Sequence, residues 1–167
     1  GGRLSSRFVR ISLDELLSQR TAFDSAVEKS PEIDKFCSSA AWLIPAAKHL
    51  HPDHVDTLIF NLPSGYCALM VILTQGFGRL AIPLEASWGM GAPFVGEHSS
   101  AVLDQSFDAL NHHSDLFDAI YTFGYPSGGE WTEGIISRNL HHKLGWGIES
   151  KRVIASLEGG MDGWLSR

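Results

Sequence analysis

The sequence is poor in cysteine, in long apolar runs and in clustered positive charge. Its two cysteines, Cys37 and Cys67, have apolar neighbours, which is typical of reduced thiols in a cytoplasmic protein and not of a disulfide framework. The apolar runs fall short of the roughly 18 residues that a membrane-spanning helix needs. Thirteen basic residues stand against nineteen acidic ones, and no lysine–arginine cluster supports a nucleic-acid surface. We therefore expect neither a membrane span nor a nucleic-acid partner.

What is present is enough apolar material for one globular core. The chain has 167 residues, of which 44% are hydrophobic and 19% are charged. That composition excludes intrinsic disorder, and the length suits one domain better than two. We therefore expect residues 1–167 to form a single domain.

The hydrophobic periodicity predicts strands and helices in an α+β order. A capping box at Ser12 and Glu15 predicts a helix start, and turn residues near Gly65 predict a β-hairpin. The expected strands are Arg7–Ser12, His54–Leu62, Tyr66–Gln75, Arg79–Ser87, Asp118–Tyr125 and Ile148–Leu157. The expected helices run from Ser12 to Lys29, from Ser39 to Leu50, from Ser99 or Ser100 to Asn111, from Ser127 to a C-cap at Gly145, and onward from Met161. These elements predict a largely antiparallel sheet with helices packed on its faces.

A histidine-rich segment resembles the H-x-H-x-D-H metal motif of the metallo-β-lactamase superfamily. Its residues are His49, His51, Asp53 and His54. Imidazole and carboxylate ligands suit Zn²⁺, which would activate a bound water for hydrolysis. That motif should follow a buried strand, whereas here a predicted helix precedes it and a predicted strand follows. We therefore favour a polar helix end without metal, and keep a zinc-dependent metallohydrolase as the alternative.

Two further loops contain glycine at positions that invite comparison with ligand-binding motifs. The segment Gln75–Ala81 approaches the acetyl-CoA loop of N-acetyltransferases, but Leu80 stands where glycine or alanine is needed and a strand follows. We therefore predict a hairpin turn there. The aromatic, glycine-rich loop Trp88–Phe94 suits either ligand contact or a buried corner. We select Trp88, Met90 and Trp131 as candidate substrate-binding residues, while the sequence identifies no catalytic residue.

A succession of short motifs carries a family resemblance from about Phe36 to Arg167. They are Ala41-Trp42-Leu43, Ile82-Pro83-Leu84, the run Ala92–Gly96, Tyr125-Pro126-Ser127, Leu144-Gly145-Trp146 and the run Leu157–Arg167. In this order they resemble the N-terminal half of the CelD/BcsL-like acetyltransferases, which belong to the FemAB-type tandem GNAT group.

The resemblance implies a GNAT-like domain that does not itself bind acyl-CoA. Acyl-CoA would be bound by a C-terminal GNAT half of the same protein, and this half would supply packing surface and part of the acceptor groove. The acceptor would be a small molecule or a polymer, and the segment alone would be inactive. Because Trp88–Gly91 replaces the family's usual loop, its acceptor contacts do not carry over. A degenerate GNAT module that only docks a partner is a second alternative.

Overall fold

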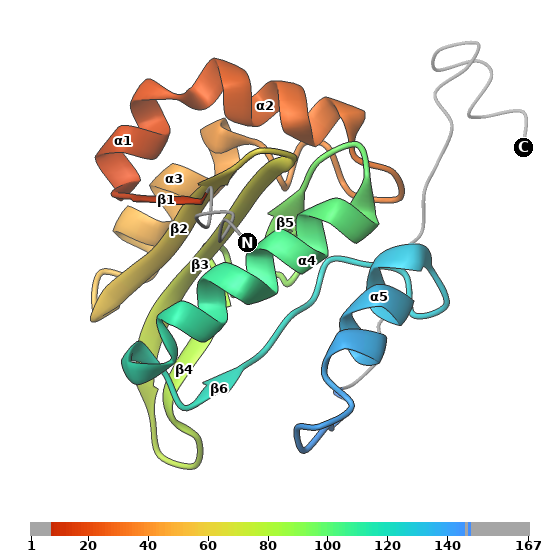
Figure 1. Cartoon of the computed structure of the whole chain (residues 1–167). Helices are drawn as coiled ribbons and strands as arrows, with labels where there is room; N and C mark the ends of the chain where they lie inside the picture. Colours follow the sequence, from red (N-terminus) through yellow and green to blue (C-terminus); the bar gives the residue numbers. More distant parts are fainter. Residues whose placement is uncertain (1–7, 146, 148–167) are drawn as a thin grey trace, which may run out of the picture.

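The computed structural model describes residues 8–145 and 147, which fold around a mixed, largely antiparallel open sheet (Figure 1). The strand order is β1-β2-β3-β4-β6, and β5 pairs with the start of β3 on the edge that β4 also uses, opposite to β2. Every pairing is antiparallel except that of β4 with β6, which is parallel. The strands are β1 (Val9–Ile11), β2 (Asp56–Leu62), β3 (Gly65–Thr74), β4 (Gly78–Pro83), β5 (Phe94–Val95) and β6 (Ala119–Ile120). The predicted fold class is confirmed, and it is consistent with a GNAT-like α+β fold.

Helices cover both faces of this sheet (Figure 1). One face packs against α1 (Leu13–Ser18), α2 (Arg20–Lys29) and α3 (Ala40–His49). The other face packs against α4 (Ser99–His112) and α5 (Glu130–Arg138), with a short 3-10 helix at Ser114–Leu116.

The central strand β3 divides the core in two, because successive side chains of a strand point to opposite faces. Ala68 and Met70 belong to the cluster under α1–α3, whereas Cys67 and Leu69 belong to the cluster under α4 and α5. Both faces of β3 are therefore buried from Tyr66 to Val71, which agrees with the nearly continuous apolar sequence there.

The N-terminal helix begins as predicted but is interrupted. The Ser12 hydroxyl accepts a hydrogen bond from the Glu15 amide at 3.0 Å, and Glu15 Oε1 accepts one from the Ser12 amide at 3.2 Å. The predicted continuous helix is wrong at Gln19, where α1 ends and α2 begins. There the Gln19 side chain accepts hydrogen bonds from Asn61 and from the Tyr66 hydroxyl, both at 2.9 Å. The helix is therefore interrupted at the residue whose side chain bonds to β2 and β3.

The C-terminal elements differ more from expectation. The predicted strand Asp118–Tyr125 is reduced to β6. Helix α4 begins after His98, which makes no side-chain capping bond, so the expected serine cap is absent at its start. Helix α5 ends at Arg138 with Asn139 as its C-cap, and not at Gly145.

The predicted strand Ile148–Leu157 and the predicted helix start at Met161 lie outside the described residues. Within the described part of the chain, no helix combines the length and apolarity that crossing a membrane requires.

Candidate functional site

A carboxylate is buried directly after β4. Glu85 is 0% exposed, and its Oε1 accepts a hydrogen bond from the Trp88 amide at 2.7 Å. Its Oε2 is buried and has no hydrogen-bond partner among the described residues. Burying a carboxylate oxygen without a partner is costly, so such groups are uncommon and often mark functional sites. Glu85 is therefore the most unusual polar group of this structure.

Three aromatic rings contact one another in succession, and the first belongs to Trp88, whose amide binds Glu85. The Trp88 ring lies 5.6 Å from the Trp42 ring, centroid to centroid, and the Trp42 ring lies 5.5 Å from that of Phe36. Trp88 is 58% exposed and Phe36 is 67% exposed, so the row is accessible at both ends. In the middle, Trp42 Nε1 is buried and has no partner in the described part of the chain. We call Phe36, Cys37, Trp42, Glu85 and Trp88 the Glu85 corner.

The thiol of this corner is protonated and unsuited to nucleophilic attack. Burial raises the pKa of Cys37, and the nearby charge of Glu85 raises it further. Cys67, near the start of β3, is fully buried, and this burial raises its pKa strongly. Nucleophilic cysteines need the opposite shift, toward the thiolate. Neither cysteine is therefore activated for covalent chemistry.

The loop that carries Trp88 is fixed at both ends. At its start, the Ala86 amide donates to His51 Nε2 at 3.3 Å. At its end, the Ala92 amide donates to the Ser38 hydroxyl at 3.0 Å. Next to it, Gly124 has φ +89°, and a side chain there would come within 2.8 Å of the Gly91 backbone. These contacts hold the loop against the residues that flank α3 and against Gly124.

The structure brings two of the three predicted contact residues into one loop. Trp88 lies in the Glu85 corner, and Met90 follows two residues later, partly exposed. Trp131 belongs instead to the core under α4, on the opposite face of the sheet. It is 0% exposed, its indole N–H donates to the Pro31 carbonyl at 2.9 Å, and its ring stacks on Tyr125. The structure thus separates Trp131 from Trp88.

Sequence reasoning missed Phe36, Trp42 and Glu85 as site residues. One signal was present, because Glu85 is the single charged residue between Leu80 and Glu97 in an otherwise apolar or small segment. A charged side chain inside an apolar run can be an exposed strand end or a buried functional group. Only the tertiary structure decides between these.

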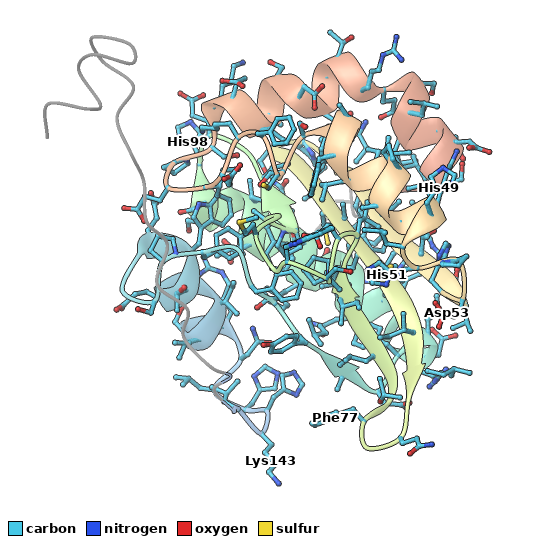
Figure 2. All side chains as sticks on the ribbon, turned by 180° about the vertical axis from the view of Figure 1, so that it is seen from behind. His49, His51, Asp53, Phe77, His98 and Lys143 are labelled. Atoms are coloured by element: carbon cyan, nitrogen blue, oxygen red, sulfur yellow. The ribbon has the colours of Figure 1, made fainter. Side chains whose placement is uncertain are left out.

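The histidine motif does not assemble into a metal centre. Figure 2 shows His49, His51 and Asp53 one after another along the end of α3 and the turn beyond it. His51 Nε2 is engaged by the Ala86 amide, and His54 Nδ1 lies 2.6 Å from the His51 carbonyl. Among residues 8–145 and 147, no group of three or more histidine, cysteine or acidic side chains could hold a metal ion.

The other histidine pairs also lie near helix ends. His112 Nδ1 and His113 Nδ1 each lie 2.8 Å from a carbonyl oxygen of the last turns of α4, those of Asp108 and Ala109. His141 and His142 follow α5 and are exposed, with ring centroids 3.9 Å apart.

The candidate site is therefore a small corner that combines a buried carboxylate with aromatic rings. One oxygen of the carboxylate accepts a hydrogen bond and the other has no described partner, and the rings at the two ends of the row are exposed. No family model, no curated protein and no solved structure matches the chain.

Proposed function

We propose that this chain is the acceptor-binding half of a tandem acyltransferase, with acyl-CoA bound by a C-terminal GNAT half. In that reaction an acceptor hydroxyl or amine attacks the thioester carbonyl of acyl-CoA. The carbon–sulfur bond breaks, and CoA leaves with the proton that the acceptor loses. The α+β fold class supports the proposal. The free, buried cysteines support a cytoplasmic setting.

A second observation concerns the segment that approaches an acetyl-CoA loop in sequence. Residues 75–77 form the turn between β3 and β4, and the Thr74 hydroxyl donates to the Gly78 carbonyl at 3.0 Å across it. Phosphate cradles of this type rely on the free amides at the start of a helix. Because a strand follows here, we assign pyrophosphate binding to the other half of the protein.

The observation that carries the proposal is the Glu85 corner. Acceptor sites combine apolar surface with a few polar groups that fix orientation. The accessible rings of Phe36 and Trp88 provide the surface, and the buried carboxylate of Glu85 provides the polar group. The exposed ring of Trp88 adds little to the stability of the fold, because it remains in contact with water. Its position next to the buried charge of Glu85 therefore favours a role in binding.

The test uses the full-length natural protein and compares Trp88→Ala with Phe77→Ala. Phe77 is 68% exposed at the tip of the β3–β4 hairpin (Figure 2), at the opposite end of β4 from Glu85, so it controls for loss of an exposed aromatic ring. We expect Trp88→Ala to raise the KM for the acceptor about tenfold or more, the loss of one well-placed aromatic contact. The KM for acyl-CoA should stay unchanged in both variants. An unchanged acceptor KM in Trp88→Ala would refute the proposal.

One observation favours a docking module as the second candidate. Leu73 and Phe77 are 69% and 68% exposed near the tip of the β3–β4 hairpin, where they offer apolar surface to a partner protein. Acyl-CoA titration of the full-length protein separates the two functions. Saturable binding supports the acyltransferase, and absence of binding favours docking.

A further inference from the structure

Four histidine rings form hydrogen bonds within the described part of the chain, and one of these bonds runs in the opposite direction. The Nδ1 atoms of His54, His112 and His113 lie 2.6, 2.8 and 2.8 Å from backbone carbonyl oxygens, so these rings donate. His51 Nε2 instead lies 3.3 Å from the Ala86 amide nitrogen. A backbone amide can only donate, so the His51 ring is the acceptor of that bond.

The direction of each bond decides how it responds to a proton. A neutral imidazole has one N–H group and one lone pair, whereas a charged imidazole has two N–H groups. Donation from Nδ1 therefore survives protonation. Acceptance at Nε2 does not, because the added proton occupies the lone pair and two N–H groups then face each other. The bond between His51 and Ala86 thus exists only while the ring is neutral and carries its hydrogen on Nδ1.

This bond fixes one end of the loop of residues 84–93, which joins β4 to β5 and which we call the Trp88 loop. The other end is fixed by the Ser38 hydroxyl, which accepts from the Ala92 amide and does not ionise in the accessible pH range. The His51 side chain is partly exposed, so a proton from solvent can reach it. The start of the Trp88 loop therefore depends on the charge of His51, and its end does not.

We propose that His51 is a pH-dependent anchor of the Trp88 loop: the neutral ring holds the start of the loop, and the charged ring releases it. Histidine side chains change charge between about pH 5 and 8, so the anchor acts in that range. Above it the bond is intact, and below it the Ala86 amide has lost its partner. The consequence for function rests on the proposed acceptor binding, which weakens in acid because the start of the loop that carries Trp88 is no longer fixed.

Charged and titratable groups lie on three segments around His51. They are Asp14 on α1, Lys48, His49, Asp53 and His54 on its own segment, and Glu85 at the start of the Trp88 loop. Asp14 pairs with Lys48 at 3.0 Å, and no ion pair among the described residues includes His51. No paired carboxylate therefore compensates for the bond that protonation removes.

The test measures hydrogen exchange at the Ala86 amide in the full-length natural protein, expressed as a protection factor that corrects for the intrinsic pH dependence of exchange. We expect protection to fall about fivefold between about pH 8 and about pH 5, the equivalent of one lost hydrogen bond. In His51→Gln the fall should disappear. The glutamine side-chain oxygen can accept from the amide in place of Nε2, and it does not ionise.

His49→Gln is the matched control. His49 is an exposed histidine at the end of α3, two residues before His51, and its ring forms no hydrogen bond with the described residues. This variant removes the same titrating group from the same segment, so the fall in Ala86 protection should persist in it. A fall that His49→Gln abolishes would contradict the assignment to His51.

A measurement on the unmodified protein covers the case in which His51→Gln fails to fold. Nitrogen NMR of the His51 ring at about pH 8 should place the hydrogen on Nδ1, because Nε2 must keep its lone pair for the Ala86 amide. A hydrogen on Nε2 at that pH would overturn the inference.

The outcomes separate the anchor from the function to which it is linked. Ala86 protection that is independent of pH, or a fall that persists in His51→Gln, overturns the inference. Neither readout involves an acceptor, so the acceptor-binding function then still depends on the comparison of Trp88→Ala with Phe77→Ala. If Trp88→Ala leaves the acceptor KM unchanged while the fall in Ala86 protection depends on His51, the anchor is supported and its role in acceptor binding is wrong.

Discussion

The hydroxyl of Tyr125 bonds to both backbone polar groups of Phe94. It accepts from the Phe94 amide at 2.8 Å and donates to the Phe94 carbonyl at 2.7 Å. Phe94 lies opposite Cys67 in the β3–β5 pair, and the ladder bond next to it runs from the Ala68 amide to the Pro93 carbonyl. The Tyr125 side chain thus forms hydrogen bonds with β5 that a neighbouring strand would otherwise form. It also holds the end of the loop that carries Trp88.

Tyr125→Phe should destabilise the fold. The change leaves two backbone groups of Phe94 without their partner, which costs about 1–3 kcal/mol in the free energy of unfolding. Burial raises the pKa of Tyr125 well above its ordinary value, so the hydroxyl keeps its proton and its donor role into alkaline solution. Urea unfolding measures the change. Tyr121→Phe is the control, because Tyr121 is exposed, and equal stability of the two variants would contradict the finding.

Glu85→Gln should make the Cys37 thiol more reactive at a fixed pH. The charge of Glu85 contributes to the raised pKa of Cys37, so its removal lowers that pKa and increases the thiolate fraction. Burial of Cys37 continues to raise it, so the thiol stays less acidic than a free cysteine. The rate of modification by a small thiol reagent near pH 8 measures this. Loss of the signal in a Cys37→Ala variant identifies the modified thiol, and an unchanged rate in Glu85→Gln would contradict the prediction.

Asp118→Asn should lower the melting temperature at neutral pH and have less effect in acid. Asp118 accepts from the Arg79 amide at 2.8 Å and from its guanidinium at 3.1 and 3.2 Å. These bonds hold the pKa of Asp118 below its ordinary value. The charged form therefore stabilises the folded state above the unfolded pKa of about 3.9, and this contribution is lost as the pH falls through the lower folded value.

Melting temperatures between pH 7 and pH 3 measure this dependence. The difference between the natural protein and Asp118→Asn should narrow only below the unfolded pKa. Asp53→Asn is the matched control, because Asp53 is exposed in the turn after α3. A constant difference across the whole range would contradict the assigned role of the Arg79–Asp118 pair.

The histidine motif should bind no stoichiometric zinc. His51 Nε2 accepts from the Ala86 amide, so a zinc ligand at that atom would have to displace this bond and shift the loop. Metal analysis of protein purified with added zinc, together with the same analysis of His51→Ala, measures this. One equivalent of zinc that His51→Ala loses would support the metallohydrolase alternative and contradict the prediction.

Much of the fold was predictable because it rests on local chemistry. The Ser12–Glu15 capping box, the β2–β3 hairpin and the start of α3 near Ser39 are decided by residues close in sequence. The nearly continuous apolar sequence of β3 is likewise a local feature, and it agrees with a strand buried on both faces. Turn residues, caps and periodicity act within a few residues, so the sequence alone determined the α+β class.

The tertiary structure decided what depends on distant partners. Gln19 interrupts a helix where Asn61 and Tyr66 bond to its side chain, and Tyr125 binds Phe94 across 31 residues. The Glu85 corner gathers Phe36, Trp42 and Trp88 from α3, the segment before it and the loop after β4. No local pattern contains such contacts, because a side chain becomes unpaired, buried or adjacent only when separate segments pack together.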